Sequence, residues 1–475
     1  MTVAASIDAS APDPRPSGSE GPLFARWERP LLVLLAFVAF LIGVGGIARL
    51  GYIGQDFPPH HGCILTFPTG FEYYQTDPAG FYLLGNALYR YVSATYYLEW
   101  LALVMLVFNT LTLGLLYRFI WQSVTLTGLR WSAALLLTFL PVRVIHAIVI
   151  AADAPTVPIF LLVALFAIQL REDPRSKLAW VGLALTLTLG LVTKYTFLGL
   201  LPPIFLLYVS TLVQRLPAGS RRYWAKFGLI SLALPTAVIS FHLWKNVQQE
   251  GAITSGHWLP PGAPSVMRWS DMLLLKRNDL ELLSAPEYFR GGIFQTQLYS
   301  YPGLVYLCSV TDSMNLFQPP TPDISVTWIQ RYRESFFRPR SEEDQTRQGW
   351  AVYASLPYFP LAVAGTLLAG CLSLRSLFTG RGLANATVVV LTALAAGYYS
   401  PIFLGLHRVL NPYEEGYWAP RLILPALLVF LLLGFWLLDR LCLRWRPTRP
   451  ALRFLPPAVA AWTGFTCLIY LSFLV

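Results

Sequence analysis

Apolar stretches of about twenty residues recur along the whole chain, and this feature most restricts its fold. A helix of that length is what crossing the hydrocarbon core of a bilayer requires. The chain has 475 residues, of which 55% are hydrophobic and only 13% are charged, whereas about a quarter of the residues in a soluble domain are charged. The sequence therefore predicts a helical protein that crosses the membrane many times. It excludes a disordered chain and an ordinary soluble enzyme.

The apolar stretches predict about eleven membrane spans. We expect them near residues 30–49, 98–118, 131–148, 155–171, 178–192, 196–214, 224–243, 351–373, 384–404, 421–438 and 455–473. Residues 1–29 are rich in Pro, Ser and Ala, which predicts a disordered cytoplasmic tail. The predicted organisation is an N-terminal transmembrane module over 30–244 with a first outward loop at 51–97, a long outward-facing region over 245–350, and C-terminal transmembrane helices over 351–475.

The distribution of Lys and Arg predicts the orientation, because cytoplasmic loops of membrane proteins are enriched in these residues. With the N-terminus placed in the cytoplasm, the cytoplasmic segments hold 19 basic and 7 acidic residues. The C-terminus then lies outside, and the net charge of +10 marks topology rather than a nucleic-acid partner. We expect a bacterial inner membrane, with an endoplasmic-reticulum membrane as the alternative.

Two outward segments are long enough to carry structure of their own. The first begins with an irregular polar stretch, GQDFPPHHGCILTFPTGFEYYQTDP, and continues as an amphipathic helix from Ala79 to Tyr91. We expect this segment and the 245–350 region to lie on the outer membrane surface. Cys63 and Cys308 either form a disulfide there or remain free thiols.

Ionisable side chains at or within a bilayer are costly, so those near the outer ends of the spans are candidates for function. Asp56 lies a few residues after the first span, where a shielded carboxylate can take a proton from an acceptor hydroxyl. A solvated loop acid or a helix cap is the alternative. Asp77 precedes Pro78, which is typical of an N-cap followed by proline at the first helical position, and we favour that capping role.

A second group of candidates lies in PVRVIHAIVIAADAP. Arg143 and His146 are three residues apart and share a helix face. Arg143 can bind a phosphate through two hydrogen bonds, or it is neutralised by Asp153 or extends to the interface. Asp153 is either functional or the N-cap of the following span. His146 is either a substrate contact or an interfacial polar residue.

The remaining candidates are mostly cationic. Lys194 lies between two apolar runs in GLVTKYTFLG, where it either binds a substrate phosphate or anchors a lipid headgroup. Arg421 begins an apolar helix, where a cation opposes the helix dipole. An anionic substrate or the carboxylates of Glu414 and Glu415 must therefore hold it there. His407 lies in the same outward loop and is a further substrate-binding candidate.

Four motifs occur in a fixed order over residues 30–440. The acidic Asp56 follows the first span, and an outward helix then opens with proline and aromatic residues in DPAGFYLLGNALYRY. An acid opens a span in AADAPTVPIFLLVALFAIQL, and the next span ends in a Lys-aromatic pair in GLALTLTLGLVTKYTF. Last, a Tyr-rich loop leads into an Arg-led helix in YEEGYWAPRLILPALL. In this order and placement the chain resembles the GT-C superfamily of integral membrane glycosyltransferases, most closely the protein-mannosyltransferase-like and aminoarabinose-transferase-like branch (glycosyltransferase family 39).

The sequence departs from the family pattern at two of these motifs. Phe57 follows Asp56, so the adjacent acidic pair of some relatives is absent. Leu422 follows Arg421, where the family usually has a tyrosine.

The resemblance implies an all-α polytopic membrane protein, a GT-C-like bundle with amphipathic outward-facing helices. The donor would be a polyprenyl-phosphate sugar, and the acceptor a hydroxyl of a lipid-linked glycan, an envelope polymer or a protein at the outer face. By this resemblance Asp56 is the general base, and Asp77 places the sugar or only caps its helix. Inverting direct displacement needs no cofactor or metal, although a divalent cation stays an alternative.

The resemblance also implies the residues that hold the donor. Arg143, Lys194 and Arg421 would bind the donor phosphate, and Asp153 would orient one of them or bind sugar. Cations at this position stabilise the charge that grows on a phosphate leaving group.

Two other classes of protein compete with this interpretation. A transporter or flippase of a lipid-linked or anionic substrate is the first, but such proteins usually show paired broken helices in two corresponding halves, which this sequence lacks. A non-catalytic membrane scaffold is the second, and it leaves Asp56, Asp153 and Arg421 without a purpose.

Overall fold

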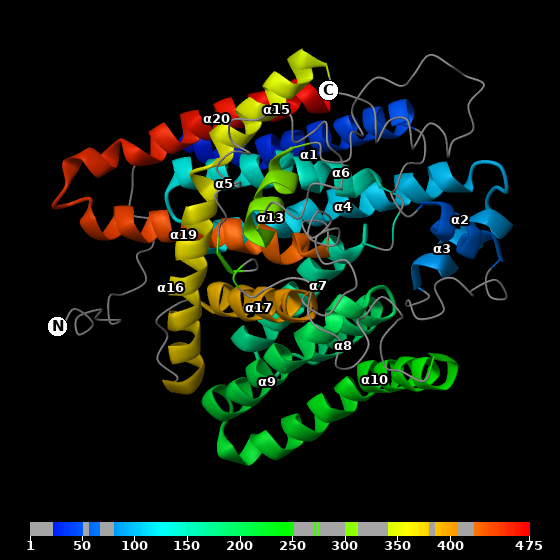
Figure 1. Ribbon diagram of the computed structural model, residues 1–475. Helices are drawn as coiled ribbons and strands as arrows, with labels where there is room; N and C mark the ends of the chain where they lie inside the picture. Colours follow the sequence, from blue (N-terminus) through cyan, green and yellow to red (C-terminus); the bar gives the residue numbers. More distant parts are fainter. Residues whose placement is uncertain are drawn as a thin grey trace.

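The structure is a computed structural model that describes residues 22–50, 57–66, 80–149, 151, 153–250, 270, 273–274, 300–311, 341–379, 385–406 and 422–475. Within these ranges every regular element is a helix, which confirms the predicted fold class of an all-α polytopic membrane protein. In the part of the chain that the structure describes, eight helices are long and apolar enough to cross a membrane, and one bent helix pair adds a ninth if it counts as a single span. Figure 1 shows many of the long helices running side by side, with α16 crossing them steeply.

The long helices are α1 (Pro22–Leu50), α4 (Tyr97–Ser123), α10 (Ala218–Glu250), α16 (Tyr358–Thr379), α17 (Ala386–Leu406), α19 (Leu424–Trp445) and α20 (Leu455–Leu474). The shorter elements are α2 (Phe57–Thr66), α3 (Gly80–Tyr91), α5 (Thr127–Phe139), α6 (Pro141–Ile148), α7 (Thr156–Glu172), α8 (Lys177–Leu191), η1 (Tyr195–Leu200), α9 (Leu201–Arg215), α13 (Tyr301–Val310), α15 (Glu342–Ser355) and η4 (Pro450–Arg453).

Each predicted span overlaps a helix, but the count of about eleven crossings is not confirmed. Helix α7 has 17 residues and α8 has 15, which is fewer than the roughly 20 that a full crossing needs. Most side chains of α7 are buried, because α4, α8 and α17 pack around it. Helix α7 therefore forms part of the interior, whereas α8 keeps one exposed apolar face that includes Leu178 and Leu185. Apolar content alone does not distinguish such short helices from spans.

The predicted span over 131–148 is two helices, α5 and α6, which meet at an angle of 44°. Leu140 at the break has extended backbone angles, φ −51° and ψ 121°, and Pro141 occupies the first turn of α6. Proline has no N–H to donate, and it disfavours the helical conformation in the residue before it. The first helix therefore ends at Phe139, and α6 starts in a new direction with all eight of its residues buried.

Close packing of backbones holds two of the spans together. A Cβ added at Gly365 of α16 would overlap the Leu433 carbonyl oxygen of α19, and one added at Gly434 would lie 3.0 Å from the Ala362 nitrogen. Small residues at such contacts are what allow membrane helices to approach closely. Asp439 of α19 is fully buried, and its carboxylate accepts hydrogen bonds from the backbone N–H groups that precede α5.

The described residues of the 51–97 segment form two helices, α2 and α3, which pack together at one end of the molecule (Figure 1). The predicted amphipathic helix is confirmed as α3, which buries Phe81 and Tyr82 on one face. The prediction of irregular structure before it is wrong for residues 57–66, which form α2. The Asn86 side chain explains part of this order, because its Nδ2 donates to the Ile64 carbonyl at 2.8 Å. His61 stacks on Tyr97 of α4, and burial lowers the pKa of its imidazole below the usual value.

Helix α13 differs from the prediction that the 245–350 region lies on the outer membrane surface. Its residues Leu304, Leu307 and Val310 are buried in the main hydrophobic core, and α13 packs against α6 and α15. The apolar residues of YPGLVYLCSV surround the helix rather than forming one face, which favours an interior position. Cys308 of α13 and Cys63 of α2 are both buried free thiols, so the structure contains no disulfide between them.

Candidate functional site

An ion pair between Asp153 and Lys194 is the centre of the candidate site. The Lys194 ammonium lies 2.9 Å from Oδ1 of Asp153, and the two side chains are 21% and 5% exposed. The lysine of the Lys-aromatic motif and the acid before α7 therefore meet, although 41 positions separate them in the sequence. The ion pair does not support the interpretation of Lys194 as a simple headgroup anchor. Asp153 therefore contacts one of the three cations that the resemblance names, and its role toward substrate stays a prediction.

The turn before α7 holds Asp153 in place. Asn109 of α4 is buried, and its Nδ2 donates to the Ala154 carbonyl at 3.1 Å and to the Met105 carbonyl at 3.0 Å. The Asp153 carbonyl accepts hydrogen bonds from both the N–H and the hydroxyl of Thr156. The capping alternative for the Asp153 carboxylate is wrong, because α7 has no side-chain cap and its N-cap position is Pro155.

The segment that carries Lys194 is held from two sides. On one side the Gly80 N–H at the start of α3 donates to the Val192 carbonyl at 2.7 Å. A Cβ added at Gly80 would lie 2.6 Å from the same oxygen, so only glycine permits this approach without displacement. On the other side Thr196 donates from its hydroxyl to the buried Tyr398 hydroxyl of α17 at 2.8 Å. Both Asp153 and Lys194 lie close enough to Tyr398 to interact electrostatically with its hydroxyl.

Arg143 is enclosed within the bundle. Its side chain is on α6, the residue is 4% exposed, and its Nε donates to the Thr138 carbonyl at 2.6 Å. Among the described residues no carboxylate forms an ion pair with it. Asp153 pairs with Lys194 instead, and the burial of Arg143 excludes extension to the interface, so neither sequence-derived alternative to a functional role holds.

His146 lies one turn after Arg143 on the same short helix and is also buried. The placement of both side chains inside the bundle follows from the break at Leu140, which turns α6 away from the axis of α5. His146 is therefore an interior residue of the bundle rather than an interfacial one.

The structure reveals polar residues that sequence reasoning missed. Asn109 lies within the apolar run LVMLVFNTLTL, and an amide inside a span was a readable signal. Tyr398 carries no such signal, because a tyrosine in a membrane helix is common near interfaces. Arg171 was counted among the cytoplasmic loop cations, yet it is 4% exposed and bridges α7 to α9.

Four predicted site residues lie outside the described residues, so their predictions stay as predictions. These are Asp56, Asp77, His407 and Arg421. Within the part of the chain that the structure describes, no group of three or more His, Cys, Asp or Glu residues is placed to hold a metal ion.

Comparisons with known proteins find similarity among solved structures. No protein-family model matches the chain, and no curated protein matches it. Among solved structures, the chain is similar to the crystal structure of ArnT from Cupriavidus metallidurans in the apo state, with a TM-score of 0.37 and 15% sequence identity. The similarity covers 87% of this chain and 78% of that chain. We draw no conclusion about activity from a likeness at this TM-score and identity.

Proposed function

We propose that the protein is a membrane glycosyltransferase that moves a sugar from a polyprenyl-phosphate-linked donor to an acceptor hydroxyl at the outer face of the membrane. The observation that carries the proposal is the burial of Arg143 with no ion pair to a described carboxylate. A buried guanidinium without a counter-charge is costly, and a bound anion removes that cost. A phosphate on a lipid tail is an anion that can reach a cation enclosed among membrane helices, and the order of the four sequence motifs supports the same donor.

In this proposal the cations of the site hold the phosphate that becomes the leaving group. Arg143 donates hydrogen bonds to its oxygens, and Lys194 is aimed by the carboxylate of Asp153 at 2.9 Å. Arg421 is a third cation, and His146 and His407 contact the donor. Fixed positive groups in a site shielded from water stabilise charge that develops on a leaving group far better than water does.

The reaction would be a single inverting displacement. Asp56 takes the proton of the acceptor hydroxyl as general base. The acceptor oxygen then bonds to the anomeric carbon while the bond from that carbon to the phosphate oxygen breaks. The bonding electrons leave with polyprenyl phosphate. Asp77 either places the sugar or caps its helix, and no step requires a metal.

The test uses purified, detergent-solubilised protein and a panel of polyprenyl-phosphate sugars, with membrane extract as the source of acceptor. Release of free polyprenyl phosphate measures turnover, and equilibrium binding of each donor is measured separately. We expect wild type to consume one donor, Asp56→Asn to bind that donor without turnover, and Arg143→Met to lose binding. Arg171→Met is the matched control, because it removes an equally buried arginine elsewhere and should leave donor binding per folded molecule unchanged.

One result would reject the transferase assignment. If wild type binds and consumes none of the donors, the glycosyltransferase proposal is wrong. Movement of a lipid-linked substrate across sealed vesicles would then be the next measurement, since a transporter or flippase is the alternative.

A further inference from the structure

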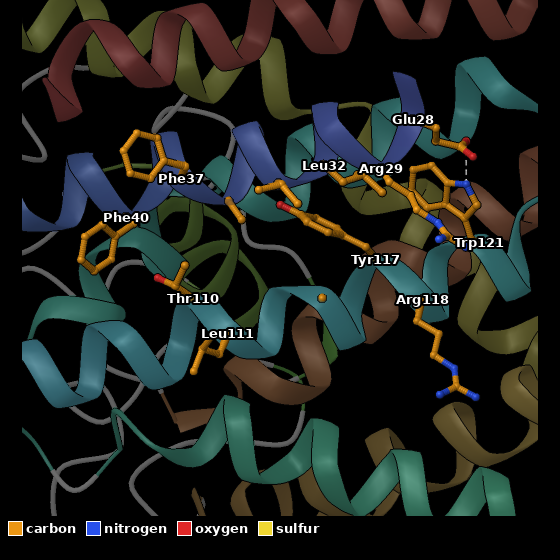
Figure 2. Close-up of a pocket in the computed structure, with 13 residues that line it drawn as sticks. Glu28, Arg29, Leu32, Phe37, Phe40, Thr110, Leu111, Tyr117, Arg118 and Trp121 are labelled. Atoms are coloured by element: carbon orange, nitrogen blue, oxygen red, sulfur yellow. Dashed lines mark hydrogen bonds between the residues drawn. The ribbon is translucent and has the colours of Figure 1, made fainter. Parts of the chain in front are cut away.

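A groove between α1 and α4 borders the candidate site at Tyr117, whose hydroxyl is hydrogen-bonded to the Thr138 hydroxyl next to Arg143. It has a volume of about 840 Å³. Its lining comes from only these two helices: Glu28, Arg29, Leu32, Val33, Ala36, Phe37, Phe40, Thr110, Leu111, Gly114, Tyr117, Arg118 and Trp121. Figure 2 shows Glu28, Arg29 and Arg118 toward one end of the groove, with the Arg118 side chain extending away from the other two, and Phe37 and Phe40 toward the other end. Both helices are candidate membrane spans, so the groove extends into the membrane.

The apolar part of the groove is open. Val33 is 70% exposed, Phe37 53% and Leu111 73%. At Gly114 on the groove wall, an added Cβ would meet nothing within 4 Å. A trough of exposed apolar side chains on membrane-spanning helices is a surface that an acyl chain covers.

The charged end of the groove has an excess of positive charge. Its single acid, Glu28, is already engaged, because its Oε1 accepts a hydrogen bond from Trp121 at 2.7 Å and lies 3.9 Å from the Arg130 guanidinium. Arg29 and Arg118 are exposed on neighbouring helices. Their two charges therefore remain for a ligand that carries negative charge.

The charged end of this groove and the segment of Lys194 lie toward opposite ends of α4. Tyr97 at the start of α4 packs in the cluster that contains α3, and α3 contacts the segment of Lys194. Arg118 lies 21 residues further along the same helix, which is about 30 Å at 1.5 Å per residue. The distribution of Lys and Arg predicts that the Arg118 end faces the cytoplasm.

We infer that the groove binds an anionic phospholipid, with its headgroup phosphate between Arg29 and Arg118 and one acyl chain along Phe37 and Leu111. Charge complementarity favours this ligand, because two arginines at the end of an apolar trough match a phosphate at the end of a hydrocarbon chain. This assignment does not depend on the proposed transferase function.

The first experiment measures lipid binding to the intact, detergent-purified protein by native mass spectrometry. The probes are phosphatidylglycerol and phosphatidylcholine with identical acyl chains. We expect wild type to prefer phosphatidylglycerol, and Arg29→Ala/Arg118→Ala to lose about thirtyfold in that preference, since each arginine near an anionic headgroup is worth about fivefold. Arg215→Ala/Arg444→Ala is the control with the same change of charge, and it should keep the wild-type preference because both arginines are exposed outside the groove.

The second experiment tests the apolar part of the groove. Gly114→Leu places a side chain in the trough, and Gly464→Leu places one on α20, where an added Cβ also meets nothing within 4 Å. We expect only Gly114→Leu to weaken phosphatidylglycerol binding, with the thermal midpoints of both variants close to that of wild type.

Three results would overturn the inference. They are a phosphatidylglycerol preference unchanged in Arg29→Ala/Arg118→Ala, unchanged binding in Gly114→Leu, and arginine-dependent binding of polyprenyl phosphate without binding of phosphatidylglycerol. The last result would assign the groove to a different lipid.

Discussion

Arg143 and Arg171 are buried to the same extent, each with 4% of its surface exposed, but their surroundings differ. Arg171 donates to the Ser210 hydroxyl at 3.0 Å, to the Thr211 hydroxyl at 3.4 Å and to the Gln214 side-chain oxygen at 2.8 Å. Arg143 donates from Nε to one backbone carbonyl. The first guanidinium is surrounded by acceptors, whereas the second has one acceptor among the described residues, so its other N–H groups are available to a ligand.

The comparison teaches that burial alone does not identify a functional cation. The acceptors of Arg171 all lie on α9, so this arginine ties α7 to α9, and Gln214 continues the connection by donating to the Leu377 carbonyl of α16. Such a network is typical of a structural contact. The contrast yields opposite expectations for the two residues in stability and in activity.

The largest effect is expected for Arg143→Met, which replaces the guanidinium by an apolar side chain of similar length. Donor turnover should fall by about a hundredfold or more, the cost of removing one group that stabilises developing charge. The thermal midpoint should stay the same or rise, because the substitution removes a buried charge that has no counter-charge among the described residues. Turnover and thermal unfolding are measured on the same preparation. A lowered midpoint with unchanged turnover per folded molecule would place Arg143 in the same structural class as Arg171.

The opposite pattern is expected for Arg171→Met. Three acceptors on α9 lose their buried donor, so the free energy of unfolding should fall by about 3 kcal/mol. Donor turnover per folded molecule should remain that of wild type. Denaturant titration and the turnover assay check the two statements. Loss of donor binding without loss of stability would show that burial and hydrogen-bond count do not separate the two arginines.

A double-mutant cycle on the Asp153–Lys194 pair sharpens the comparison, because this cation has a described counter-charge. Asp153→Asn should lower the free energy of unfolding by about 2 kcal/mol, since it removes the carboxylate 2.9 Å from Lys194, whose side chain is only 21% exposed. Adding Lys194→Gln should restore part of that loss, with a coupling energy of about 1 kcal/mol. Additive effects of the two substitutions would mean that the two side chains have no coupling energy and that the ion pair contributes nothing to stability.

A smaller effect is expected where α3 meets the Lys194 segment. Gly80→Ala forces its methyl group against the Val192 carbonyl and should cost about 1–2 kcal/mol of stability. Gly62→Ala on α2 is the control, because an added Cβ there meets nothing within 4 Å. Thermal unfolding of both variants checks the difference. Equal midpoints would show that α3 is not held tightly against this segment.

The helical class and the positions of the spans were predictable, because apolar runs are dictated by the bilayer. The number of crossings was not predictable, since α7 and α8 are as apolar as a membrane span but shorter. Pro141 was a visible sign of a break in 131–148. The resulting direction of α6 depends on what packs around it, which the sequence does not contain.

For the site, the choice of Arg143, Asp153 and Lys194 came from the rule that charge near a bilayer is costly. The pairing of Asp153 with Lys194 could not be predicted from that rule, because the two residues meet only through the packing of α7 and α8. The burial of Arg171 could not be predicted, because a cation at the end of a span fits equally well in a loop or in the interior. Asp56, Asp77, His407 and Arg421 stay predictions from sequence alone.

The break at Leu140 has one more consequence. The carbonyl that accepts from Arg143 belongs to Thr138, in the last turn of α5, so the arginine closes the end of the helix from which its own helix departs. An anion that binds this guanidinium therefore changes the contact that holds the bend between α5 and α6. Because the coupling is reciprocal, a change that straightens the bend weakens binding of the anion by the same factor by which the anion favours the bend. Amide exchange near residues 136–140 would then report occupancy of the site without any turnover.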